Sequence, residues 1–169
     1  MTLNPPELIL LRHGIAEERS NDLPDHDRRL TAAGQQRTRA VLERVRALGI
    51  LAERLVSSPL VRARQTAAIA VECGIAPAME LSGAMAPGAD PMPWLTAWLT
   101  EAPATLMLVG HEPDLGLLAS HLIAAPAGSI RFRKAGLARI QLTDPEPIRD
   151  GTPGGGCLTL LLTPKALLS

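Results

Sequence analysis

The chain has 169 residues, near the usual size of one domain, and 46% of them are hydrophobic, which argues against a disordered protein. Lys plus Arg and Asp plus Glu each number 17, so the formal net charge is zero and gives no general attraction to nucleic acids or anionic membranes. Aromatic residues make up only 2%, which disfavours a base-stacking surface for single-stranded nucleic acid. We therefore expect one domain over residues 1–169, with no nucleic-acid or membrane partner.

The cysteines and the N-terminus indicate a compartment. Cys73 and Cys157 form neither a C-x-x-C pair nor a disulfide framework, which favours a reducing environment. The first seven residues, MTLNPPE, lack the charged and apolar regions of a signal peptide. No apolar run approaches the roughly 20 residues that a membrane-spanning helix needs. The expected location is the cytoplasm.

The hydrophobic pattern predicts alternating strands and helices. Continuous apolar runs indicate strands that are buried on both faces, and apolar residues three or four apart indicate helices. Two helix starts carry a capping residue, namely Thr31 for the first helix and Ser58, followed by Pro59, for the second. The predicted elements in chain order are a strand at 7–12, a loop at 16–29, a helix at 32–48, a strand at 54–57, a helix from 59 to about 73, a short strand near 79, a helix at 94–100, a strand at 105–110, a helix after 111 to about 122, and strands at 137–142 and 158–162.

The last two strands flank the segment TDPEPIRDGTPGGG at 143–156, which we expect to be a long hairpin connection. Its three glycines follow no strand-to-helix pattern and lack the G-K-[ST] ending of a phosphate loop, so a flexible turn is predicted. The order of the elements as a whole predicts an α/β fold, a three-layer α/β/α sandwich with a largely parallel central sheet.

Three predicted strands end in residues suited to binding phosphate. The first strand ends at Arg12 and His13, the second leads into Ser58, and the strand at 105–110 ends at His111. The carboxyl ends of parallel strands meet at one edge of a sheet, and Arg62, one helical turn after Ser58, can reach the same edge. Two guanidiniums, two imidazoles and two helix N-termini at one place favour an anion, and arginine forks match phosphate oxygens.

Several motifs in order carry a family resemblance. LLRHG, SSPLVRARQTA and LVGHEPDL are similar to motifs of the histidine phosphatase superfamily, and most similar to its short branch, the SixA-type phosphohistidine phosphatases. The segments DRRLTAAG at 27–34, APGAD at 86–90 and the late FRKAGLARIQL extend the similarity over nearly the whole chain. The resemblance implies a phosphoglycerate mutase-like fold.

The resemblance also implies roles for single residues. His13 would be the nucleophile that carries a transient phosphoryl group, Arg12 and Arg62 would hold the phosphoryl oxygens, and His111 would donate a hydrogen bond to the transferring group. Ser58, besides capping its helix, is a secondary candidate for a phosphate contact. No metal ion or other cofactor is implied, and the sequence has no Cys/His cluster or H-E-x-x-H motif. Gly14 is expected to let the backbone turn sharply behind the nucleophile.

The general acid is the least specified part of the pattern. Larger family members supply a glutamate from a long segment between the second and third motifs, and this segment is short here. Its candidates are Glu80 and Asp90, with Glu17 as a third near the nucleophile, although a solvated surface carboxylate is the simpler interpretation for each. An imidazole leaving from a phosphoramidate needs less protonation than an alkoxide, so a weakly specified acid favours a P–N substrate.

The predicted function is that of a phosphohistidine phosphatase, which removes phosphate from a phosphohistidine on a signalling or phosphotransfer protein and releases inorganic phosphate. One alternative is a small-molecule phosphomonoesterase or a phosphoglycerate mutase-like enzyme on the same fold, which would act on a small phosphorylated substrate. A second alternative is a non-catalytic module that binds phosphoproteins, against which the complete set of four site residues counts.

Other polar residues have simpler interpretations. Arg62 has an alternative partner in Glu72 on the same predicted helix. His121 is predicted to be buried and hydrogen-bonded, and His26 to be a solvated loop residue.

Overall fold

The computed structural model of the protein describes residues 5–101 and 104–169. The segment MTLNPPE, in which no signal peptide was found, therefore lies mostly outside the described residues. The strands are β1 (Glu7–Arg12), β2 (Arg54–Ser57), β3 (Glu80–Leu81), β4 (Thr105–Gly110), β5 (Leu137–Leu142) and β6 (Gly156–Leu162). The helices are α1 (Ala32–Ala47), α2 (Val61–Glu72), α3 (Met92–Trp98), α4 (Asp114–Leu122), α5 (Glu146–Asp150) and α6 (Pro164–Leu168), with 3₁₀ turns at Asp25–Asp27 and Gly83–Met85. None of the helices within these described ranges is long and apolar enough to cross a membrane.

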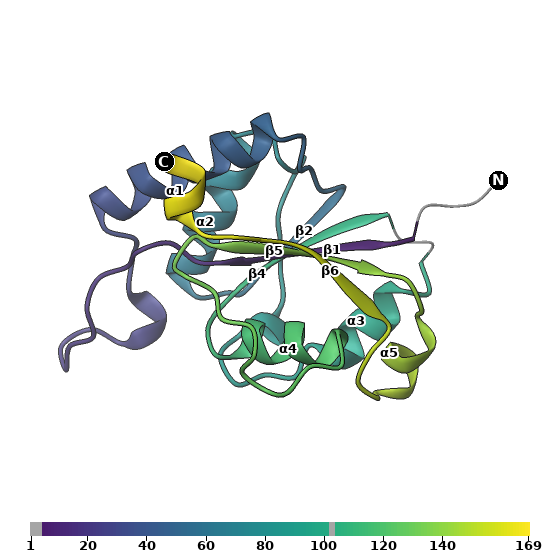
Figure 1. Cartoon of the computed structure of the whole chain (residues 1–169). Helices are drawn as coiled ribbons and strands as arrows, with labels where there is room; N and C mark the ends of the chain where they lie inside the picture. The colour runs from purple at the N-terminus through teal and green to yellow at the C-terminus, as the bar shows by residue number, and fades with distance from the viewer. Residues whose placement is uncertain (1–4, 102–103) are drawn as a thin grey trace.

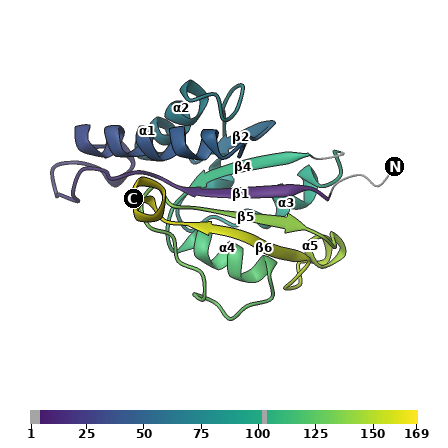
Figure 2. The ribbon, with the colours of Figure 1, turned by 45° about the horizontal axis from the view of Figure 1, so that its top comes forward.

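The strands form one sheet in the order β3-β2-β4-β1-β5-β6. Strands β1 to β4 are parallel to one another, and β5 and β6 are antiparallel to their neighbours. Helices α1 and α2 cover one face of the sheet, and α3, α4 and α5 cover the other (Figure 1). Figure 2 shows the same arrangement from a second direction. The predicted three-layer sandwich with a mostly parallel sheet is confirmed.

The side chains of strand β1 contribute to a hydrophobic core on each face of the sheet. Successive side chains of a strand point to opposite faces. Ile9 and Leu11 pack in the cluster beneath α1 and α2, whereas Leu8 and Leu10 pack in the cluster beneath α3 and α4. All four are at most 1% exposed. A continuous apolar run is therefore the expected sequence of a strand covered on both sides.

The second predicted helix begins later than expected. Helix α2 starts at Val61, its N-cap is Leu60, and no side chain caps it. The Ser58 hydroxyl accepts a hydrogen bond from the Leu60 amide at 3.3 Å, but it also lies 2.8 Å from a ring nitrogen of His111. The serine therefore lies in the turn before the helix and contacts the neighbouring strand end, so its predicted place as N-cap is wrong.

The C-terminal third contains two short helices that were not predicted. Helix α5 lies inside the segment expected to be an irregular connection, and it ends at Gly151, whose φ of 70° provides a left-handed C-cap. Helix α6 follows Thr163, whose side chain accepts a hydrogen bond from the Ala166 amide. Helix α3 begins at Met92, two residues before the predicted start. The short strand near Met79 is confirmed as β3.

The register of three adjacent strands brings their carboxyl ends to the same level. Arg12 of β1 pairs with Gly110 of β4, and Ser57 of β2 pairs with Val109. The backbone continues this alignment by one residue, because the His13 amide donates to the Gly110 carbonyl at 3.1 Å and the Ser58 amide donates to the Val109 carbonyl at 2.9 Å. The residues that follow the three strands thus meet at one edge of the sheet.

Candidate active site

His13 is held in one orientation and one tautomer. Its ring is 6% exposed, and its Nδ1 lies 2.7 Å from the Gly14 carbonyl oxygen. A carbonyl oxygen only accepts hydrogen bonds, so Nδ1 carries the proton and the neutral ring keeps its lone pair on Nε2. The pKa of His13 is lowered to about 3, mainly by burial and also by the charges of His111, Arg62 and Arg12, while the Gly14 hydrogen bond opposes the shift. At neutral pH the imidazole is therefore uncharged, and its free Nε2 lone pair is available to an electrophile without a base to deprotonate the ring.

His111 lies beside His13 on the neighbouring strand end. The two ring centroids are 5.1 Å apart and the planes are inclined at 52°. The His111 Nε2 is 2.8 Å from the Ser58 hydroxyl, which fixes the ring. The pKa of His111 is lowered to about 4, mainly by burial and also by the charges of Arg62 and Arg12, while the Asp25 carboxylate opposes the shift. His111 is thus also neutral at pH 7.

The two predicted arginines lie at the same site. Arg12 donates from Nη1 to the Phe132 carbonyl at 2.7 Å, and Arg62 is only 3% exposed. Three buried nitrogens here, namely Arg12 Nε, Arg62 Nε and His111 Nδ1, have no hydrogen-bond partner among the described residues. Unpaired buried polar groups destabilise a folded protein, so a ligand whose oxygens accepted hydrogen bonds from these nitrogens would relieve that cost. The structure therefore brings together the four residues Arg12, His13, Arg62 and His111.

Asp25 is a site residue that the sequence interpretation missed. Arg62 donates from Nη1 to the Asp25 carbonyl at 2.6 Å and from Nη2 to its carboxylate at 2.9 Å. The same carboxylate accepts from Arg28 at 2.8 Å, and the hydrogen bond from Arg28 holds the pKa of Asp25 far below its usual value, followed by that from Arg62. Asp25 is thus an ionised partner of Arg62 and not a proton donor. Glu72, the alternative partner of Arg62, instead pairs with Arg39.

The motif around Arg62 supports the site through two further side chains. The Thr66 hydroxyl accepts from the Gly14 amide at 3.0 Å and donates to the Arg62 carbonyl at 2.8 Å. Gln65 accepts from the Leu30 amide at 2.7 Å and so ties the preceding loop to α2. Through these contacts the R-A-x-Q-T segment, residues 62–66, fixes the backbone just after His13 against the helix that carries Arg62.

Gly14 is required for a reason other than the predicted one. Its φ lies outside the left-handed region, so a sharp turn that only glycine can adopt is not present. A Cβ at this position would instead lie 2.2 Å from the Thr38 hydroxyl oxygen, closer than any real contact. The glycine therefore lets α1 approach the backbone behind His13.

Glu112 is a second carboxylate near the site that was not predicted. Its Oε1 accepts a hydrogen bond from the Phe132 amide at 2.5 Å, and Phe132 in turn accepts from Arg12 through its carbonyl. Burial lowers the pKa of Arg12, the Glu112 charge raises it, and the Arg133 charge lowers it. Glu112 thereby orders the loop that holds Arg12 and balances part of its charge.

The three candidate acids each have another contact. Glu80 forms a two-pronged ion pair with Arg54, whose hydrogen bond lowers the Glu80 pKa. Glu17 accepts from the Arg29 amide at 2.8 Å, and Asp90 accepts from the Met92 amide at 3.0 Å at the start of α3. These are structural contacts of carboxylates, of which Glu80 and Asp90 are exposed and Glu17 is partly buried, and a role as general acid stays a prediction for all three.

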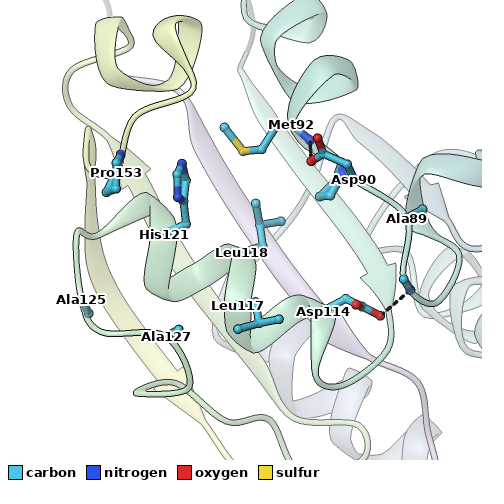
Figure 3. Close-up of a pocket in the computed structure, with 12 residues that line it drawn as sticks. Ala89, Asp90, Met92, Asp114, Leu117, Leu118, His121, Ala125, Ala127 and Pro153 are labelled. Atoms are coloured by element: carbon cyan, nitrogen blue, oxygen red, sulfur yellow. Dashed lines mark hydrogen bonds between the residues drawn. The ribbon is translucent and has the colours of Figure 1, made fainter.

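Asp90 and His121 line a different pocket, which is shown in Figure 3. It has a volume of about 520 Å³ and lies between residues 88–92, α4 and the loop after α5. Asp114 also lines it and accepts from the Gly88 amide at 3.2 Å. The predicted hydrogen bond of His121 is missing for its Nε2, which is buried without a partner within the described part of the chain. His26, as predicted, is a solvated residue, with its side chain 69% exposed.

A search of the described residues finds no group of three or more His, Cys, Asp and Glu side chains placed to hold a metal ion. Charge at the site comes instead from the two guanidiniums. Arginine pairs with phosphoryl oxygens in two-pronged fashion, so Arg12 and Arg62 have the chemistry to bind and polarise a phosphoryl group.

Comparisons with known proteins indicate the family of the chain. The model of the histidine phosphatase superfamily (branch 1) matches residues 8–81, a segment that contains Arg12, His13 and Arg62. The chain belongs to the histidine phosphatase superfamily. A full-length relative, an uncharacterised protein of Picosynechococcus sp. (strain ATCC 27264 / PCC 7002 / PR-6), is 40% identical over 176 residues that cover 96% of this chain and 99% of the relative.

Solved structures of the superfamily share the fold. The protein histidine phosphatase SixA in complex with tungstate superposes with a TM-score of 0.81 at 23% identity and covers 95% of this chain and 99% of its own. The putative phosphohistidine phosphatase SixA from Agrobacterium tumefaciens has a TM-score of 0.73 at 22% identity, with 94% and 98% covered. A mycobacterial glucosyl-3-phosphoglycerate phosphatase has a TM-score of 0.70 at 16% identity, with 95% and 100% covered. The phosphoglycerate mutase-like fold is thus confirmed. Membership of the histidine phosphatase superfamily supports a phosphatase with a histidine nucleophile.

Proposed function

We propose that the protein is a phosphohistidine phosphatase that hydrolyses the P–N bond of a phosphohistidine on a signalling or phosphotransfer protein. One observation carries this proposal: a neutral His13, with its proton fixed on Nδ1, lies among two guanidiniums and a second imidazole. This arrangement joins a nucleophile to the groups that bind a phosphoryl dianion.

In the proposed reaction, the Nε2 lone pair of His13 attacks phosphorus in line with the leaving group. The substrate ring, protonated from solvent on the nitrogen that does not carry phosphorus, leaves as a neutral imidazole when its P–N bond breaks. Arg12 and Arg62 bind the equatorial oxygens, and His111 donates to one of them, so that the charge of the transition state is offset. Water then attacks the phosphoryl group on His13, which releases inorganic phosphate and restores the neutral imidazole.

The substrate class follows from the proton requirement. An alkoxide leaving from a phosphate ester needs a placed acid, whereas a phosphoramidate nitrogen can be protonated before it departs. Glu17, Glu80 and Asp90 all have structural contacts, and Asp25 is held ionised by arginines. A site whose general acid is only weakly specified is better suited to cleaving a P–N bond than the P–O bond of an ester. The fold shared with SixA proteins supports the same substrate.

The proposal also covers the metal requirement and the cellular compartment. We infer that turnover needs no added metal, since two guanidiniums are already placed to offset phosphoryl charge. A cytoplasmic setting is expected from the two cysteines, which are both free thiols in the structure.

The test compares two substrates and one variant. The protein and its His13→Ala variant are incubated with a phosphohistidine-bearing protein and, separately, with p-nitrophenyl phosphate, and released phosphate is measured. We expect turnover of the phosphohistidine substrate by the native protein and none by the variant. Efficient hydrolysis of the ester with no hydrolysis of phosphohistidine would refute the proposal.

The second candidate function is a phosphatase of small phosphorylated molecules. It is favoured by the fold shared with a glucosyl-3-phosphoglycerate phosphatase. Under this alternative the ester would be the better substrate, and one of Glu17, Glu80 and Asp90 would have to move to the site as general acid. Binding of a phosphoprotein without turnover of either substrate would instead indicate the non-catalytic module.

A further inference from the structure

Arg12 borders a hollow of about 720 Å³ on the surface of the protein, which we name the cationic hollow. Besides Arg12 at the end of β1, it is lined by cations from three other segments of the chain. These are Arg37 on α1, Arg133 and Lys134 in the loop before β5, and Lys165 on α6. Its remaining lining residues are Ile15, Thr163 and Pro164, so the lining contains no carboxylate.

Four of the five cations of the cationic hollow have no ion-pair partner among the described residues. Arg37, Arg133, Lys134 and Lys165 form no salt bridge with any Asp or Glu of residues 5–101 and 104–169. Seven arginines outside the hollow do form salt bridges, as Arg39 does with Glu72. A chain with equal numbers of acidic and basic residues has therefore gathered an excess of positive charge on one side of its active site.

The position of the hollow connects this charge to the substrate. Arg12 takes part in both the phosphate site and the hollow, and Arg133 is close enough to lower the pKa of Arg12 by charge repulsion. Helix α6, which carries Lys165, is held against α1 by the hydrogen bond from Arg44 Nε to the Leu167 carbonyl at 3.2 Å. The two helices lie side by side in Figure 1. Any group bound in the hollow is thus adjacent to the phosphoryl group on the Arg12 side.

We propose that acidic side chains around the phosphohistidine of the protein substrate bind in the cationic hollow. This inference rests on the proposed function and adds to it the kind of surface that the substrate presents. Arg37, Arg133, Lys134 and Lys165 are all exposed, with long side chains that adapt to a partner surface. Exposed charges of this kind increase the association rate and the selectivity for a complementary macromolecule. An enclosed small-molecule site would instead bury most of its ligand among apolar side chains.

The experiment uses two synthetic phosphohistidine peptides of equal length. In the first, Asp and Glu flank the phosphohistidine, and in the second these residues are replaced by Asn and Gln. The native protein is compared with the double variant Arg37→Gln/Lys165→Gln and with the control Arg46→Gln. Arg46 is an exposed arginine on the same helix as Arg37 but outside the hollow.

At low ionic strength, the native protein and the control should have about tenfold higher kcat/KM for the acidic peptide than for the neutral one. The double variant should lose this preference through KM, with kcat and the turnover of the neutral peptide unchanged. Added salt should reduce the preference of the native protein, because exposed charges are screened.

Two failures are distinguishable. Equal kcat/KM of the native protein for both peptides, or an equal loss in the Arg46→Gln control, would overturn the docking proposal and leave the phosphatase proposal intact. No hydrolysis of either peptide by the native protein would overturn the proposed function and this inference with it.

Discussion

Lowering the pH should destabilise the protein through the two active-site histidines. Burial depresses the pKa of His13 to about 3 and that of His111 to about 4, whereas a histidine in an unfolded chain has a pKa near 6.5. Between these values the unfolded chain binds more protons than the folded one. The free energy of unfolding therefore falls as the pH is lowered from about 6.5 towards 4.

The size of the effect follows from the pKa differences. At pH 5 each ring is protonated in the unfolded chain and neutral in the folded one, which lowers the free energy of unfolding by about 2 kcal/mol per ring relative to pH 7.5. The two rings together contribute about 4 kcal/mol. Asp25 adds nothing in this window, because the hydrogen bonds from Arg28 and Arg62 hold its pKa far below the usual value and it stays ionised.

The assay is urea denaturation at pH 7.5 and pH 5.0 in buffers without phosphate, which would otherwise stabilise the folded state by binding. The His13→Asn variant removes one of the two rings. Its decrease in the free energy of unfolding between pH 7.5 and pH 5.0 should therefore be about 2 kcal/mol smaller than that of the native protein. His26→Asn, a change at an exposed loop residue, should keep the native loss. If the free energy of unfolding decreased equally in the native protein and in His13→Asn, the assignment of a neutral, buried His13 would be refuted.

Three further changes have expected outcomes. Ser58→Ala removes the hydroxyl that lies 2.8 Å from His111, and kcat should fall about tenfold in steady-state assays. The far-ultraviolet circular dichroism spectrum should be unchanged. An unaltered kcat would show that the His111 ring needs no such partner. Gly14→Ala places a Cβ 2.2 Å from the Thr38 hydroxyl oxygen, so thermal or urea unfolding should show a destabilisation of about 1–3 kcal/mol, and native stability would contradict the close approach. Overnight dialysis against EDTA should leave phosphatase activity unchanged, and a loss that is restored by a divalent cation would contradict metal-independent turnover.

Much of the site follows from local sequence patterns. The apolar runs before Arg12 and before His111 predict strands covered on both faces, and parallel strands place their carboxyl ends at one edge. Because the direction and ends of these strands are encoded locally, residues about 100 positions apart in the chain can be predicted to meet. The ring centroids of His13 and His111, 5.1 Å apart, confirm this part of the prediction.

The partners of the site residues could not be predicted in the same way. Asp25 lies in an irregular loop and reaches Arg62 across 37 positions of sequence, a contact that depends on how this loop folds over α2. A buried guanidinium requires a carboxylate or an oxygen-rich partner, but Glu72, the acid on the same helix, pairs with Arg39 instead. The Ser58 hydroxyl likewise contacts His111 because of the position of β4, which its own sequence does not encode.

The short C-terminal helices illustrate a limit of periodicity. Helices α5 and α6 have five residues each, which is too few to show an apolar repeat. Their signals were local ones, namely prolines at the first positions, Gly151 at one end, and Thr163 as a cap. For α5 these signals lie within a segment, 143–156, whose glycines and prolines are equally typical of an irregular connection.

The most direct test of the central claim is the detection of the phosphoryl group on His13. The protein is mixed with a phosphohistidine-bearing protein labelled with ³²P, quenched in base within milliseconds, and digested for mass spectrometry. We expect an acid-labile, base-stable phosphoryl group on the peptide that contains His13, formed before phosphate is released and absent from the His13→Ala variant. Turnover of the substrate with no label on that peptide at any time, or with the same turnover in the variant, would contradict the role of His13 as nucleophile.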